Sequence, residues 1–194
     1  MNYLLIDIGN SETKLYFYKK RIVRKIFIKS KIISEKVLRN KLSFTSKKKN
    51  RVDKVVLSSV VPNLTKKIKK FFKSRNNLKV NEIKDFNLKK HLKIKLNKKY
   101  VGSDRIANAI GVDKYKNYIV IDFGTATTFD IIIKNQYYGG LISPGVKLSL
   151  ETLFKKASLI NPIKLKKIKV VVGKSTKEAV RSGFFWGYIG LINN

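Results

Sequence analysis

Two stretches of this chain share one order of apolar and polar positions. Residues 3–18 and 118–133 each begin with an apolar run that meets an Asp-x-Gly triplet. Small hydroxyl or amide residues follow the triplet, and a second apolar run returns. This order predicts two hairpins, the first with strands at residues 3–7 and 13–18, and the residues at 21–28 predict a third strand.

The rest of the chain alternates strand-like and helix-like runs. Ser103 is the expected N-cap of a helix at 103–112, and Gly139-Gly140 is the expected turn after the second hairpin. Further predicted elements are strands at 51–58 and 168–172, helices at 63–73, 146–156 and 176–192, and short strands and loops at 75–100. Strands followed by helices, twice over, predict an α/β duplication with a boundary near residues 105–115.

The two hairpins are copies of one pattern. In register with one another are Asp7, Gly9 and Thr13 of the first copy and Asp122, Gly124 and Thr128 of the second. A repeated strand–turn–strand predicts a duplicated lobe with a phosphate held between the copies. One Asp-x-Gly alone is more often only a hairpin turn, but two copies in register favour phosphate binding.

The residue types in these loops suit a nucleotide phosphate and a metal ion. An ionised aspartate at a strand end is costly to bury unless it meets a cation or hydrogen-bond donors. The glycine two residues later lets backbone N–H groups turn toward an anion. Lys14 adds a compact cation, and short donors come from Asn10, Ser11, Thr125, Thr127 and Thr128. These groups predict amides that bind phosphate beside an acid that holds a metal ion.

A second motif, Gly102-Ser103-Asp104-Arg105, opens the helix predicted at 103–112. The helix dipole favours an ionised Asp104, which can then accept a proton from a substrate hydroxyl that attacks phosphorus. Arg105 can bind a substrate carboxylate through two hydrogen bonds. Taken alone, the motif is more often a helix cap with a surface ion pair. Asp130 has two open interpretations, as a partner behind the site or as a strand residue that faces the cleft.

Composition narrows the class of protein. A hydrophobic fraction of 43% predicts a soluble globular chain, and no apolar run is long enough for a transmembrane helix. Zero cysteines exclude disulfides and thiolate metal sites and fit a reducing cytoplasm. The net charge of +32 invites a nucleic-acid function. Because the lysines are scattered, we expect the charge to reflect compositional drift rather than a selected nucleic-acid surface. Nucleic acid would then bind only incidentally, at low salt.

Taken together, the motifs resemble those of the type III pantothenate kinase family, in the acetate/sugar kinase–Hsp70–actin superfamily. The resemblance covers nearly the whole chain. The matching segments are Asp7–Lys14 to DxGN[ST]xxK, Ser58–Pro62 to SSVVP, Gly102–Arg105 to GxDR, Asp122–Thr128 to DxGTATT, Gly139–Gly145 to GGxIxPG and Gly173–Thr176 to GxxT. Each segment is modest alone, but their common order is highly specific.

The resemblance implies transfer of the ATP γ-phosphate to pantothenate, the first step of coenzyme A synthesis, by a cytoplasmic homodimer that uses Mg²⁺. It implies Asp104 as the general base and Asp122 as the ligand of a monovalent cation, K⁺ or NH₄⁺. The implied ATP contacts are Asp7, Ile8, Gly9, Asn10, Ser11, Glu12, Thr13, Lys14 and Thr125, and the implied pantothenate contacts are Gly102, Ser103, Asp104, Arg105 and Thr176.

The resemblance also implies a fold of two ribonuclease H-like (actin-like ATPase) lobes with a cleft between them. We expect an N-terminal lobe at 1–105 and a C-terminal lobe at 106–194, the second shortened at its C-terminus relative to the family. Where family members carry a pantothenate-contacting tyrosine, this chain has Leu96, and Tyr100 lies too close to Gly102 to replace it.

A non-catalytic family member that acts as a nucleic-acid-associated regulator is the alternative function. The basic composition favours that alternative. The intact Asp104 and Asp122 favour the kinase, because a regulator needs no catalytic base. A sugar or acetate kinase of the same superfamily is disfavoured by the compact GxDR motif.

Overall fold

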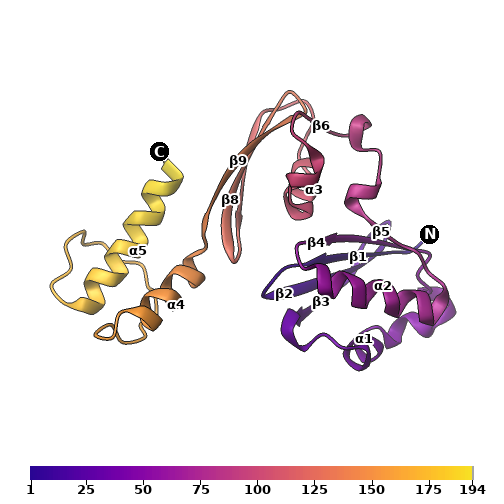
Figure 1. The fold of residues 1–194 in the computed structure, drawn as a ribbon, viewed down its shortest axis with the longest axis horizontal. Coiled ribbons are helices and arrows are strands. Elements are labelled where there is room, and N and C mark those ends of the chain that lie inside the picture. Colours follow the sequence, from indigo (N-terminus) through magenta and orange to yellow (C-terminus); the bar gives the residue numbers. More distant parts are fainter. Residues whose placement is uncertain (194) are drawn as a thin grey trace. The chain divides into compact units, whose positions relative to one another are not determined.

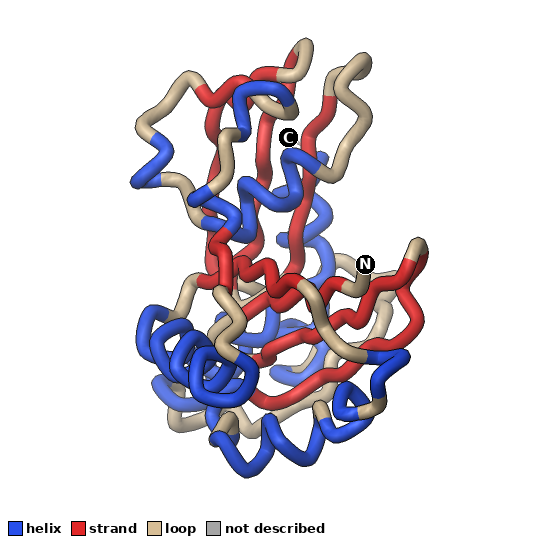
Figure 2. The backbone as a smooth tube through the Cα atoms, turned by 90° about the vertical axis from the view of Figure 1, so that its right-hand side faces the viewer, coloured by secondary structure: helices blue, strands red, loops and turns tan. Residues whose placement is uncertain are grey.

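The computed structural model describes residues 1–193, apart from the side chain of Asn76. The chain forms two compact units. The first unit comprises Met1–Val120 and Asp130–Gly140, and the second comprises Ile121–Phe129 and Leu141–Asn194. Helices and strands are interspersed along the backbone (Figure 2), so the predicted α/β class, with two sheets, is confirmed. The predicted lobe boundary between residues 105 and 106 stays a prediction.

The first sheet contains five strands in the order β3-β2-β1-β4-β5 (Figure 1). Their bounds are Tyr3–Ile8 (β1), Glu12–Lys19 (β2), Arg21–Lys29 (β3), Lys54–Ser59 (β4) and Val80–Glu82 (β5). Strands β1 and β2 pair antiparallel, as do β2 and β3, whereas β4 is parallel to both β1 and β5. The first predicted hairpin and the strand after it are therefore confirmed.

Two helices cover this sheet, α1 (Glu35–Lys41) and α2 (Pro62–Asn76) (Figure 1). Alternate residues of β1 point to one face, and Leu4 and Ile6 share a buried cluster there with Leu38 of α1 and Ile68 of α2. Helix α1 begins after Ser34, whose hydroxyl accepts a hydrogen bond from the Val37 N–H. This core supports the end of β1, where the first phosphate motif lies.

The second sheet has the strand order β6-β9-β8-β7. Its strands are β6 (Lys93–Ile94), β7 (Tyr118–Phe123), β8 (Ala126–Ile133) and β9 (Gln136–Pro144). Helix α3 (Ser103–Ile110) packs on it within the first unit, where Ile106 shares a buried cluster with Ile132 and Tyr137. Helix α3 also contacts β4 of the first sheet.

The second unit contains helices α4 (Val146–Lys156) and α5 (Thr176–Asn193) (Figure 1). Short 3-10 helices lie elsewhere in the connections, at Ser30–Ile32, Ser43–Ser46, Lys48–Asn50, Ile83–Asp85, Leu88–Lys90 and Lys98–Tyr100. None of the helices in residues 1–193 combines the length and the apolar character needed to span a lipid bilayer.

Three local predictions were wrong. The N-cap of α3 is Gly102 rather than Ser103, which is already helical. The Gly139-Gly140 pair lies inside β9, because Lys134 and Asn135 adopt positive φ angles of 46° and 58° and make the turn from β8. No strand forms at 168–172 in the described part of the chain.

The reason for the missing strand lies on α5. The Val170 carbonyl accepts a hydrogen bond from the indole Nε1 of Trp186 at 3.2 Å. The Ser182 hydroxyl donates to the Val171 carbonyl. Helix side chains therefore satisfy carbonyl groups that a strand would present to a neighbouring strand.

Candidate active site

The loop of the first motif, at residues 9–11, is closed by backbone hydrogen bonds and supported by Ser30. The Gly9 N–H donates to the Glu12 carbonyl at 3.0 Å. Ser30 donates from its N–H to the Ser11 carbonyl at 3.0 Å and from its hydroxyl to the Gly9 carbonyl at 2.6 Å. Ser30 thus holds both ends of the loop that is expected to bind phosphate.

Sequence reasoning missed Ser30. The residue is buried and directly follows β3, and its Oγ lies 3.0 Å from the Oγ1 of the buried Thr13. The signal that could have found it is the register of β2 and β3, because Glu12 pairs with Lys29, so the residue directly after β3 must meet the loop.

Asp7 lies between Lys14 and Ser58 in the first sheet. Asp7 is paired across β1 and β2 with Lys14 and across β1 and β4 with Ser58. The Lys14 Nζ is 4.0 Å from the Asp7 Oδ2, and both side chains are about two-fifths exposed. An ion pair of this kind is weak, so a ligand that offers phosphate to Lys14 or a metal ion to Asp7 can displace it at little cost.

The loop of the second motif is held differently. The Gly124 N–H donates to the Ala126 carbonyl at 2.9 Å, and the Gly145 N–H donates to the Thr125 carbonyl at 2.9 Å. A Cβ atom on Gly145 would lie 2.2 Å from the Gly124 carbonyl oxygen. Asp122 near the end of β7 and Thr125 of the loop are both exposed. The start of α4 therefore touches the loop backbone directly, which only a glycine at position 145 permits.

Asp104 lies in the first turn of α3, as predicted, and is partly buried. Its Oδ1 accepts a hydrogen bond from the Arg105 N–H at 2.8 Å. A Cβ atom on Gly102 would lie 2.4 Å from this oxygen, so the missing side chain at position 102 makes room for the carboxylate. The backbone donor and the space left at Gly102 together hold the Asp104 carboxylate at the N-terminal end of α3.

Arg105 is anchored by two residues of the second sheet. Its Nε donates to the Asp130 Oδ1 at 2.6 Å, and the Tyr137 hydroxyl donates to the same oxygen at 2.7 Å. Asp130 is fully buried, and the Arg105 side chain is 13% exposed. Of the two open interpretations, the structure supports Asp130 as a partner of the predicted site, through Arg105.

Burial decides the electrostatics of this cluster. It raises the pKa of Asp130 above the usual aspartate value, although the hydrogen bonds from Tyr137 and Arg105 act in the opposite direction. Burial also raises the pKa of Tyr137 above the usual tyrosine value, and the hydrogen bond to Asp130 adds to that rise. Tyr137 therefore stays a hydrogen-bond donor in neutral solution. Sequence reasoning missed its role.

The predicted site residues fall in both units. The first unit holds Asp7–Lys14 and Gly102–Arg105, and the second holds Asp122, Thr125 and Thr176, the exposed first residue of α5. Within the first unit, α3 contacts β4, the strand next to β1. Asp104 and Arg105 are gathered with Asp130 and Tyr137 there.

The segment before α3 bears on the missing tyrosine. Leu96 is half-exposed, and its Cδ1 would lie 3.3 Å from a Cβ atom on Gly139. Tyr100 is 88% exposed. Leu96 therefore lies against β9, whereas the Tyr100 ring projects into solvent.

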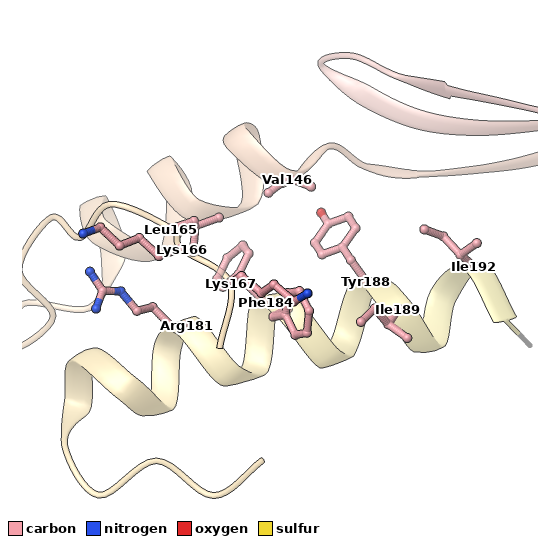
Figure 3. A pocket seen from close by; sticks show the side chains of 10 residues that line it. Val146, Leu165, Lys166, Lys167, Arg181, Phe184, Tyr188, Ile189 and Ile192 are labelled. Carbon is pink, nitrogen blue, oxygen red and sulfur yellow. The ribbon is translucent and has the colours of Figure 1, made fainter. Parts of the chain in front are cut away.

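The second unit also contains a cavity of about 370 Å³. In Figure 3, Tyr188 and Ile192 of α5 point toward the start of α4, where Val146 lies. The Tyr188 hydroxyl donates to the Pro144 carbonyl at 2.9 Å. The lining is mostly apolar and includes none of the predicted site residues, so this cavity is separate from the predicted phosphate and pantothenate contacts.

The fold resembles a solved structure. That structure is titled as a Baf family transcriptional activator from Campylobacter jejuni. The two chains superimpose with a TM-score of 0.57 at 23% sequence identity, over 97% of this chain and 77% of the other. At this identity the likeness supports the fold alone.

Sequence comparisons identify the family. The profile of type III pantothenate kinase matches residues 3–194. A type III pantothenate kinase from Pelagibacter ubique is 49% identical over 97% of this chain and 77% of its own length. The enzyme of the same name from Citrifermentans bemidjiense is 37% identical over 98% of this chain and 78% of its own length. The chain therefore belongs to the type III pantothenate kinase family.

Proposed function

We propose that this chain transfers the γ-phosphate of ATP to the hydroxyl of pantothenate, in the first step of coenzyme A biosynthesis. The observation that carries the proposal is Asp104 in the first turn of α3, next to an Arg105 whose Nε is held by Asp130 at 2.6 Å. Pantothenate has a hydroxyl that Asp104 can deprotonate and a carboxylate that Arg105 can bind. Family membership supports the same reaction.

In this reaction Asp104 acts as the general base. Its carboxylate accepts the hydroxyl proton while the hydroxyl oxygen bonds to the γ-phosphorus, and the bond from that phosphorus to the β,γ-bridging oxygen breaks to release ADP. A well-placed general base contributes about 10²- to 10⁴-fold to a rate. Gly102, Ser103, Arg105 and Thr176 are the further proposed contacts of pantothenate.

The loop at residues 9–11 and its flanking strands supply the proposed ATP contacts, Asp7–Lys14, together with Thr125. Ser30 holds the loop at both ends. The backbone N–H groups of the loop, together with Lys14, can therefore bind phosphate without first being ordered. Among the described residues no three His, Cys, Asp or Glu side chains form a metal cluster. Kinase Mg²⁺ needs only one or two carboxylates besides the phosphates, so the residues present fit it.

The further proposals rest on the family resemblance. Asp122 holds K⁺ or NH₄⁺, which suits its exposed carboxylate and the exposed Thr125 beside it. We expect turnover to depend on K⁺ in the original chain but not in Asp122→Asn.

We also propose that each chain has two ribonuclease H-like lobes and that two chains form a cytoplasmic homodimer. Sedimentation tests the homodimer. Nucleic-acid binding is proposed as incidental, so it should collapse at ~0.2 M salt.

The central experiment measures pantothenate-dependent ADP release with ATP, Mg²⁺ and K⁺. The original chain is compared with Asp104→Asn and with Asp113→Asn, an exposed aspartate that serves as a charge-matched control. We expect turnover in the original chain and in the control, and a loss of at least about 100-fold in Asp104→Asn. No turnover in the original chain would overturn the proposed function, and an active Asp104→Asn would overturn the assigned base.

A further inference from the structure

Behind Arg105 lies a buried polar cluster that the proposed reaction does not itself use. Asp130 of β8 is fully buried, and Tyr137 of β9 is 1% exposed within the apolar cluster around α3. The Asp130 Oδ1 accepts hydrogen bonds from both the Tyr137 hydroxyl and the Arg105 Nε. The three residues belong to one compact unit, so their contacts are defined within it.

Stability alone is a poor reason for this cluster. Replacing a buried ion pair by well-packed apolar residues is often neutral or stabilising. The first hairpin provides that replacement, because Leu15 occupies the position that corresponds to Asp130 in the repeat and is fully buried. The second hairpin keeps a carboxylate at this position and supplies it with two donors.

The geometry favours a role in orientation. A guanidinium is planar, with its N–H groups in a fixed fork, so a bond at Nε sets the direction of the whole group. Tyr137 holds the Asp130 carboxylate in turn, and its ring centroid lies 5.9 Å from the guanidinium carbon of Arg105. Arginine binds a carboxylate best through two parallel N–H bonds, so the direction of the fork decides how a substrate carboxylate meets it.

We propose that Asp130, held by Tyr137, is a positioning residue that orients the Arg105 guanidinium for the carboxylate of pantothenate. The inference rests on the proposed function, since it assigns a role toward that substrate. Asp130 acts through Arg105 and takes no part in proton or phosphate transfer. Its removal therefore affects the use of the substrate carboxylate and spares the use of ATP.

The experiment compares two substrates in the original chain and in Asp130→Asn. One substrate is pantothenate, and the other is its alcohol analogue, in which a hydroxymethyl group replaces the carboxylate. With pantothenate we expect kcat/KM to fall by roughly 10- to 100-fold through KM, with the KM for ATP unchanged. With the alcohol analogue, which offers Arg105 no carboxylate, the loss should be less than about threefold.

Two further variants keep the test decisive. Tyr137→Phe removes one donor to Asp130 and keeps the ring. Its loss in kcat/KM should be smaller than that of Asp130→Asn, and should again be greater with pantothenate than with the alcohol analogue. This variant serves even where Asp130→Asn folds poorly. In an Arg105→Lys background, the effect of Asp130→Asn on pantothenate should disappear, because lysine lacks the planar fork.

The outcomes separate the two proposals. If the original chain does not turn over pantothenate, the proposed function fails and the role of Asp130 fails with it. If the original chain is active but the variants lose kcat/KM equally with pantothenate and with the alcohol analogue, or lose ATP affinity as well, only the role of Asp130 is overturned.

Discussion

The two Asp-x-Gly hairpins have the same sequence pattern but are held in place by different means. The first loop is held by a side chain, since the Ser30 hydroxyl donates to the Gly9 carbonyl at 2.6 Å. The second is held by direct backbone contact, since the Gly145 N–H donates to the Thr125 carbonyl. The loop backbone lies so close to position 145 that a Cβ atom has no room there. Similar loops in a duplicated pattern therefore differ in which substitutions they tolerate.

The buried hydroxyl groups differ in the same way. In the first hairpin, the fully buried Thr13 has the Ser30 hydroxyl as a partner at 3.0 Å. In the second, the Oγ1 of the fully buried Thr127 has no hydrogen-bond partner within residues 1–193. A buried polar atom without a partner costs free energy, so the second hairpin is the less optimised for stability.

The largest expected effect is at Gly145. In Gly145→Ala the new Cβ would lie 2.2 Å from the Gly124 carbonyl oxygen and 2.7 Å from that of Thr125, so the loop backbone must move. We expect a loss of about 3 kcal/mol in the free energy of unfolding, measured by urea denaturation. Pantothenate-dependent ADP release should fall together with it.

Two other glycines are the controls for this substitution. In Gly9→Ala the Cβ would lie 3.1 Å from the Glu12 carbonyl oxygen, so a loss of about 1 kcal/mol is expected. In Gly183→Ala, on α5, the Cβ would meet no atom within 4 Å, so a gain of up to about 1 kcal/mol from helix propensity is expected. Equal losses at positions 145 and 9 would contradict the contrast between the two loops.

The next effect separates the two buried threonines. Thr13→Val removes one hydroxyl of the pair with Ser30 and should cost about 1–2 kcal/mol of unfolding free energy. Thr127→Val removes a hydroxyl without a partner in the described chain, so it should be neutral or stabilising. Urea denaturation without nucleotide measures both, and a larger loss at Thr127 would reverse the comparison.

The sequence predicted most strands and helices because their apolar patterns are local. It also predicted that Asp104 lies in the first turn of a helix, and it located the two loops, because these motifs are contiguous. It could not predict Ser30 or Tyr137, because their roles depend on pairing. Ser30 reaches the first loop only through the register of β2 and β3, and Tyr137 reaches Asp130 only because β9 returns beside β8 after the turn at 134–135.

The Asp-x-Gly repeat misleads most at one position, where the first hairpin has Leu15 and the second has Asp130. Both are fully buried, but Leu15 contacts the apolar cluster of the first sheet, whereas Asp130 accepts hydrogen bonds from Arg105 and Tyr137. A pattern of apolar positions alone would place an apolar residue at both sites. The departure from the pattern marks the residue for which we propose a positioning role.

The smallest expected effect is a pH dependence from Tyr137 of β9, which donates a hydrogen bond to Asp130 of the second hairpin. The folded chain holds the Tyr137 proton more tightly than the unfolded chain, because burial and the Asp130 carboxylate raise the pKa of its hydroxyl. Above a pH of about 10, the usual tyrosine value, the unfolded chain releases this proton and the folded chain retains it. Stability from Tyr137 is therefore complete below that pH and falls by about 1.4 kcal/mol per unit above it.

Tyr137→Phe removes this dependence. The difference in unfolding free energy between the original chain and the variant should be constant up to a pH of about 9 and should shrink above about 10. Urea denaturation at several pH values measures this difference, in which the shared lysine titrations cancel. Tyr138→Phe, on the next residue of β9, is the control for loss of an exposed hydroxyl. A difference that stays constant to high pH would show that folding does not raise the pKa of the Tyr137 hydroxyl, which would contradict its burial beside Asp130.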